Sequence, residues 1–191
     1  MCIRDSCRNE ETEVCPAGAS NADFFWIKQV QVGSINNYTG SDNGYKDFSY
    51  LSTTLSQEED YMLTLTPGFA NGSTDLYWSV FMDYNQDGDF YDSGEMVFSY
   101  EHDNPLQVTF QIPATSKVGM TTMRVALKFG GSPDACEMFT YGEVEDYKIN
   151  IVGSGFKDDA PATNRNGQEV LILEGVYPPY TGRIDLSLIH I

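Results

Sequence analysis

Hydrophobic and polar residues alternate along most of this chain with a period of two. The alternation is clearest in residues 76–83, 106–112, 122–129 and 146–152. Within 122–129, apolar residues occupy every second position from Met123 to Phe129, and Arg124 and Lys128 face the other way. A period of two predicts β-strands with one buried face.

Two further segments support the same interpretation. Residues 61–67 place Tyr61, Leu63 and Leu65 on one face, and residues 24–35 alternate with a break near Lys28 that predicts a β-bulge. Clusters of turn-forming residues separate the predicted strands. These clusters are 36–47, 67–75, 101–105 and 129–135. No stretch shows a helical stripe, so we expect an all-β fold, an antiparallel β-sandwich of jelly-roll-like type, with a barrel as the alternative.

The pattern also predicts how the chain is divided. We expect the sandwich to span residues 13–153, a polar linker 154–167, and the start of a further module 168–185. Residues 1–6 and 186–191 are both encoded by one short DNA element read in its two orientations, which resembles a sequencing-library adapter. We therefore expect both end segments to be adapter-derived and the chain to be part of a longer protein.

The balance of charge narrows the classes of partner. The chain has 11 basic and 28 acidic residues, a net charge of −17, and no apolar run long enough to span a bilayer. Nucleic acid and anionic membranes attract positive surfaces, so this balance argues against both as partners. It suits an extracellular protein or a cation-binding protein.

The cysteines point to the same compartment. Cys15 and Cys136 lie just outside the two ends of the strand-rich region, so a bond between them would close a long loop. Such a disulfide typically stabilises a protein by about 2–4 kcal/mol. Cys7 is left over and would pair with a residue preceding this chain. The alternative is three reduced thiols with no common role.

Residues 83–95, DYNQDGDFYDSGE, contain four aspartates and one glutamate with no basic residue. Their first half matches D-x-N-x-D-G-D, in which alternate side chains converge on a calcium ion and Gly88 permits the sharp turn. The candidate ligands in this loop are Asp83, Asn85, Asp87, Asp89, Asp92 and Glu95. Position 12, where an EF-hand has its bidentate glutamate, is Gly94, and predicted strands flank the loop. We expect a Ca²⁺ loop on a β-hairpin; the alternatives are a solvated acidic turn and a catalytic carboxylate pair.

A second acidic cluster lies at residues 141–147, before the last predicted strand. Glu143 and Glu145 point to the same side if this segment is extended, and Asp146 follows them. These three carboxylates either complete the coordination begun by the first loop, or stabilise the strand and pair with Arg124.

Five separated motifs, in the same order and spacing, resemble the GEVED domain. They are GEVEDY (142–147) with the preceding Cys136, WIKQVQVGSINNYTG (26–40), GYKDFS (44–49), the acidic loop (83–95) and TTMRVALKF (121–129). The resemblance covers residues 15–152. It implies a β-sandwich accessory module of secreted and surface proteins of bacteria, many of them Bacteroidetes, commonly appended to metallopeptidases and adhesins. It implies no settled activity for the module itself.

Catalytic machinery is not indicated. His102 is the one histidine outside the predicted adapter segments, and it lies in a polar turn. A Ser or Cys nucleophile normally needs a histidine base, and no H-E-x-x-H motif occurs. Paired carboxylates can hydrolyse glycosides, but a general acid needs a shielded cleft, and these acids lie in loops.

We therefore expect a non-catalytic, calcium-stabilised module of an extracellular or cell-surface protein, with neighbouring domains of the same chain as its partners. The alternative is a module that binds polysaccharide or a cell-surface protein through exposed aromatic rings. The candidate rings are Tyr38, Tyr45, Tyr50 and Tyr141, with Phe69 beside them. Ordinary core and edge packing is the competing explanation for these rings.

Overall fold

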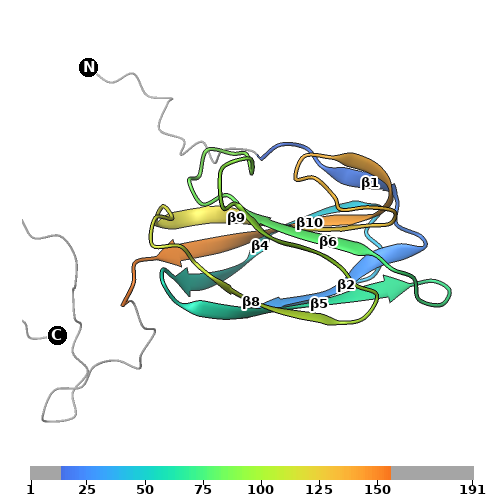
Figure 1. Cartoon of the computed structure of the whole chain (residues 1–191), viewed down its shortest axis with the longest axis horizontal. Coiled ribbons are helices and arrows are strands. Elements are labelled where there is room, and N and C mark those ends of the chain that lie inside the picture. The colour runs from blue at the N-terminus through green and yellow to red at the C-terminus, as the bar shows by residue number, and fades with distance from the viewer. Residues whose placement is uncertain (1–13, 156–191) are drawn as a thin grey trace, which may run out of the picture. The chain divides into compact units, whose positions relative to one another are not determined.

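The computed structural model of the protein describes residues 14–155, which form ten β-strands (Figure 1). The strands are β1 (Gly18–Asn21), β2 (Phe25–Val32), β3 (Ile35–Tyr38), β4 (Tyr45–Ser56), β5 (Asp60–Phe69), β6 (Tyr77–Met82), β7 (Met96–Glu101), β8 (Leu106–Gln111), β9 (Gly119–Lys128) and β10 (Met138–Val152). Among these residues the protein has no helix long and apolar enough to cross a membrane. The predicted module at 168–185, both end segments expected to be adapter-derived and nearly all of the predicted linker lie outside the described residues.

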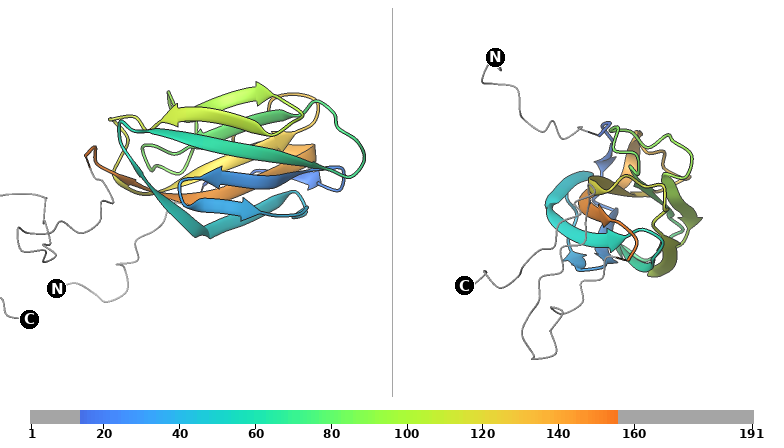
Figure 2. Two further views of the ribbon diagram at one scale, coloured as in Figure 1. Left: turned by 90° about the horizontal axis from the view of Figure 1, so that it is seen from below. Right: turned by 90° about the vertical axis from the view of Figure 1, so that its left-hand side faces the viewer.

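Two sheets pack face to face, which confirms the predicted β-sandwich (Figure 2). The larger sheet has the order β1-β10-β9-β6-β7, with β4 also paired to β10, and the smaller sheet has the order β3-β2-β5-β8. Most strand pairs are antiparallel, as predicted, but β1 and β4 both run parallel to β10. β10 is long enough for both: β1 pairs with it from Met138 to Tyr141, and β4 from Val144 onward.

The main core lies between the sheets, and β9 crosses its centre. Met123, Val125 and Leu127 point into this core, as the alternation predicts. The opposite face of β9 was expected to meet solvent, but Arg124 and Ala126 there are also buried. The reason is tertiary, since the segment leading into β1 and the acidic loop cover that face.

Predictions for single strands are confirmed where the alternation of apolar and polar residues, or a break in it, is clear. The pairing of β2 with β5 shifts register between Ile27 and Gln29, which confirms the bulge at Lys28. Leu63 and Leu65 are fully buried on β5. The predicted turn at 36–47 instead contains parts of β3 and β4, because the polar residues of these strands carry no clear alternation.

Candidate functional site

The acidic loop connects the antiparallel strands β6 and β7, so it lies on a β-hairpin as predicted. Its base is held by backbone hydrogen bonds: Met82 N donates to Glu95 O at 2.8 Å, and Asp83 N donates to Thr122 O at 3.1 Å. Gly88 has a φ of 95°, a conformation that favours glycine, and it makes the sharp turn that the motif requires.

Three carboxylates gather on the outer side of this loop. Single oxygens of Asp87, Asp89 and Asp92 all lie within 4.8 Å of one another. Asn85 Nδ2 donates to Asp87 Oδ2 at 2.9 Å and to Asp92 Oδ2 at 2.6 Å, so a partial positive charge lies between two negative groups. Rotating the Asn85 amide by half a turn would present its oxygen in the same place.

Two further carboxylates of the loop are buried beneath the first three. Asp83 accepts the Asp87 and Gly88 amides at 3.2 and 3.1 Å. Glu95 accepts the Tyr84 amide at 2.9 Å and also the Asn85 and Asp92 amides. Burial raises the pKa of both acids, and the charge of Asp83 adds to the rise in the pKa of Glu95. These two acids therefore shape the loop from inside.

The structure thus divides the six predicted ligands of the loop by role. Asp87, Asp89 and Asp92 lie close together, with Asn85 bonded to Asp87 and Asp92, whereas Asp83 and Glu95 bind the backbone of the loop. An exposed group of oxygen donors with crowded negative charge fits a hard divalent cation such as Ca²⁺.

Phe90 attaches the acidic loop to the rest of the domain. Its ring lies 6.0 Å from that of Phe81, and the guanidinium carbon of Arg124 lies 5.0 Å from its centroid. The predicted Cys15–Cys136 disulfide is present beside this contact, with a Cα–Cα distance of 5.6 Å. The loop, the disulfide and β9 therefore form one packed unit.

Arg124 lies at the centre of this unit and is 1% exposed. Its Nε and Nη2 donate to Asp146 Oδ1 and Oδ2 at 2.8 and 2.7 Å. Nη1 donates to the carbonyl of the half-cystine Cys15 at 2.7 Å and to that of Ala135, which precedes the half-cystine Cys136, at 2.8 Å. The sequence offered the three acids of the second cluster as partners of Arg124 but not the two backbone carbonyls; its position opposite the apolar face of β9 was the available signal.

Alternation along β10 assigns different roles to the successive acids of the GEVEDY motif. Glu143 points inward and accepts the Ile27 amide at 2.8 Å and the Asp42 amide at 2.5 Å. Glu145, on the same face, accepts hydrogen bonds from the hydroxyls of Thr39 at 3.1 Å and Tyr147 at 2.7 Å. The two glutamates thereby fix the β3–β4 loop against the sandwich.

Burial sets the protonation of these two glutamates. Both are 0% exposed. Desolvation raises the pKa of Glu143 to about 7, and desolvation together with repulsion from Glu143 raises the pKa of Glu145 to about 8. The usual pKa of a glutamate is about 4.5. Each group therefore holds its proton more tightly in the folded protein than in the unfolded chain.

The second acidic cluster does not complete the coordination of the first, which corrects one of the two sequence-based alternatives. Glu143 and Glu145 bind the β2–β4 region and Tyr147, and Asp146 pairs with Arg124. The second alternative, pairing with Arg124, is confirmed for Asp146. The side chains of β10 alternate, so Asp146 faces away from the two glutamates.

Comparison with known families identifies the region that holds these features. Residues 77–150 match the family model of the GEVED domain. These residues resemble the GEVED domain. The matched range contains the acidic hairpin, Arg124, Cys136 and the GEVEDY segment.

Solved structures show more distant likenesses to this chain. One is the CARDB domain of a Pyrococcus furiosus protein, solved in complex with di-metal ions: TM-score 0.36, 9% identity, 70% of this chain and 99% of that chain covered. Another is an AA10 lytic polysaccharide monooxygenase from Streptomyces lividans: TM-score 0.30, 12% identity, 52% of this chain and 59% of that chain covered. Neither likeness contributes to the functional argument. Curated proteins yield no match.

The four tyrosines proposed as a binding platform have different surroundings in the sandwich. Tyr38 lies under Lys28, Tyr50 contacts Phe48, and Tyr141 contacts Phe24. Tyr45 instead donates its hydroxyl to Asp146 at 3.1 Å. Within residues 14–155 no ring contact joins any two of the four tyrosines, so the structure does not assemble them into one stacked platform.

Proposed function

We propose that this chain is a non-catalytic accessory module of an extracellular or cell-surface bacterial protein, and that Ca²⁺ stabilises its acidic hairpin. The observation that carries the proposal is the gathering of Asp87, Asp89 and Asp92 within 4.8 Å on one loop. Two carboxylates a few ångströms apart repel each other by about 1 kcal/mol in water, and a bound cation removes that repulsion.

The rest of the loop supports the same role. Asp83 and Glu95 hold the backbone in place, so the outer oxygens are arranged before an ion binds. Calcium sites of extracellular modules have dissociation constants on the order of 10⁻⁴ to 10⁻³ M, and we expect this site to lie in that range. A tenfold excess of Ca²⁺ over such a constant would stabilise the fold by about 1.4 kcal/mol.

The disulfide supports an oxidising location, since such bonds persist in secreted and surface proteins. A parent protein of the metallopeptidase or adhesin class would place the module beside a domain that supplies the activity. In the module itself, the ring of His102, which directly follows β7, contacts the ring of Tyr100. The carboxylates of the acidic loop accept backbone hydrogen bonds. Carboxylates held in this way are better suited to binding a cation than to transferring protons in catalysis.

Thermal unfolding tests the calcium proposal directly. Millimolar CaCl₂ should raise the melting temperature by several degrees over EDTA, because ions that bind only the folded state shift the equilibrium toward it. Asp87→Ala should abolish the increase, and Mg²⁺, which requires a stricter octahedral shell, should produce a smaller one.

Asp60→Ala is the matched control, since Asp60 is exposed and lies outside the loop. This variant should keep the full response to Ca²⁺. An absence of Ca²⁺ binding by calorimetry to the folded wild-type chain, or an undiminished response in Asp87→Ala, would overturn the proposal.

A further inference from the structure

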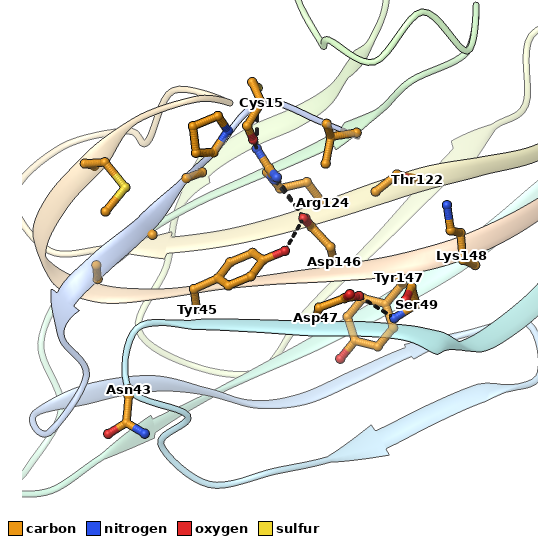
Figure 3. Close-up of a pocket in the computed structure, with 16 residues that line it drawn as sticks. Cys15, Asn43, Tyr45, Asp47, Ser49, Thr122, Arg124, Asp146, Tyr147 and Lys148 are labelled. Atoms are coloured by element: carbon orange, nitrogen blue, oxygen red, sulfur yellow. Dashed lines mark hydrogen bonds and ion pairs between the residues drawn. The ribbon is translucent and has the colours of Figure 1, made fainter. Parts of the chain in front are cut away.

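A groove with a volume of about 970 Å³ opens on the face of the larger sheet that points away from the core (Figure 3). Thr122 and Arg124 of β9 and Asp146 and Lys148 of β10 line it, between β4 on one side and residues 14–19 on the other. Met123 and Tyr147 alternate with these residues and belong to the core. The volume falls within the range of about 300–1,000 Å³ typical of small-molecule sites.

Both sides of the groove are held in place. The segment 14–19 is attached through the Cys15–Cys136 disulfide, through the bond from Arg124 to Cys15 O, and through pairing of β1 with β10. On the opposite side, Tyr45 of β4 donates its hydroxyl to Asp146 (Figure 3). A groove with such walls is formed before any ligand arrives, which lowers the entropic cost of binding.

The charge of the groove differs from that of the chain. The two lining acids, Asp47 and Asp146, are balanced by two basic residues, Arg124 and Lys148. The whole chain, in contrast, carries a net charge of −17. A strongly anionic ligand would be repelled by the whole molecule, and a cation would be attracted to the acidic hairpin rather than to this balanced surface. The groove therefore favours a polar ligand without net charge.

The groups that line the groove suit a ligand rich in hydroxyls. Arg124 and Asp146 are bound to each other in a bidentate pair, so their hydrogen-bonding capacity is largely used. Around them lie the hydroxyls of Ser49 and Thr122, the carboxylate of Asp47 and the amine of Lys148. These are donors and acceptors that vicinal hydroxyls can satisfy in both directions.

Tyr45 adds an apolar surface to this polar set. Its side chain lines the groove and is 41% exposed, while its hydroxyl is bound to Asp146. A fixed aromatic ring beside hydrogen-bonding groups matches a pyranose, which has a C–H face and hydroxyls at its edge.

We propose that this groove binds a neutral oligosaccharide, with Tyr45 as the packing surface and Asp47, Ser49, Thr122 and Lys148 as the hydrogen-bonding groups. The proposal goes beyond the metal-stabilised role of the acidic hairpin and does not depend on it.

The test is an NMR titration of the full chain with gluco-, manno-, galacto- and xylo-configured oligosaccharides, in EDTA and again in CaCl₂. At least one series should shift the backbone resonances of Tyr45, Asp47 and Lys148. Tyr45→Ala and Asp47→Asn should each weaken that binding about tenfold or more, as central contacts do. Tyr45→Phe should bind nearly as well as wild type, because the hydroxyl already serves Asp146.

Matched controls lie on the same strand but outside the groove. Tyr50→Ala removes a 74%-exposed ring of β4, and Lys46→Met removes a basic residue of β4; neither should affect binding. Three results would overturn the proposal: no shift with any series, shifts that map away from the groove, or nuclear Overhauser contacts from residues 1–13 into the unliganded groove. Because binding is also measured in EDTA, the oligosaccharide titration can be interpreted even if the calcium proposal fails.

Discussion

At the scale of single residues, the domain depends on buried ionisable side chains that are stabilised in two different ways. Arg124 and Asp146 neutralise each other in a bidentate ion pair. Glu143 and Glu145 have no basic partner among the hydrogen bonds they make, and their oxygens accept bonds from amides and hydroxyls instead. The first pair depends on both partners being present, whereas the glutamates depend on protonation.

The ion pair predicts a large effect of a single substitution. Arg124→Met should destabilise the domain by about 3–5 kcal/mol, because it leaves the Asp146 carboxylate buried and uncompensated. Adding Asp146→Asn should recover part of that loss, which urea unfolding of the single and double variants would show. Lys128→Met is the matched control on the same strand. Its ion pair with Glu137 is partly exposed and should contribute about 0–1 kcal/mol.

The two glutamates predict a pH dependence with a definite sign. Their pKa values are higher in the folded state, about 7 and about 8, so their contribution to stability is fully present below the unfolded value near 4.5. It is lost as the pH rises through 7 and 8. Glu145→Gln should therefore gain stability relative to wild type between pH 5 and pH 8, as measured by urea unfolding in EDTA.

Glu59→Gln serves as the control, since Glu59 is exposed. Equal pH slopes for wild type and Glu145→Gln would contradict the assigned cause.

At the scale of elements, the acidic hairpin is held to the sheets by two buried rings, Tyr84 in the main core and Phe90 in the outer cluster. Phe90 is 3% exposed and packs against Phe81 and Arg124, whereas the adjacent Tyr91 is 65% exposed. The sequence motif predicts the cluster of acidic residues in this loop. Only the packing reveals that the loop also covers the disulfide.

Phe90→Ala should loosen the hairpin and cost about 3 kcal/mol, in the range of buried phenylalanine truncations. Hydrogen exchange should accelerate in residues 83–95 and near Cys15, with little change in β2 and β5, because those strands belong to the other sheet. Tyr91→Ala should alter stability by no more than about 0.5 kcal/mol. Uniform acceleration across both sheets would show that Phe90 does not act locally.

At the scale of the whole molecule, the Cys15–Cys136 bond joins positions 121 residues apart, so it closes nearly the whole described chain into one loop. It also secures the segment that covers the outer face of β9 and forms one side of the groove. The stability of the domain, the packing on the outer face of β9 and one side of the groove therefore all depend on this disulfide.

Replacing both cysteines, Cys15→Ser with Cys136→Ser, should lower the free energy of unfolding by about 2–4 kcal/mol. Reductant should destabilise the wild-type chain by a similar amount and leave the double variant unchanged, as urea unfolding would show. A double variant as stable as oxidised wild type would contradict this account.

The sequence alone predicted the features that arise from local pattern and short motifs. Alternation over β5, β6 and β9 predicted the strands, the break at Lys28 predicted the bulge, and the crowded acids predicted a hairpin loop. The positions of Cys15 and Cys136 predicted the disulfide. In each case the physical cause, side-chain periodicity, local charge or chain closure, is present in a few residues of the sequence.

Only the tertiary structure determined which other residues and strands these side chains and strands contact. It buried both faces of β9, brought β1 and β4 parallel to β10, and separated the acids of β10 from those of the hairpin. It also assembled the groove from segments distant in sequence. Periodicity specifies which side chains share a face, but the partner of that face depends on how the sheets and the N-terminal segment pack, and no local pattern encodes that arrangement.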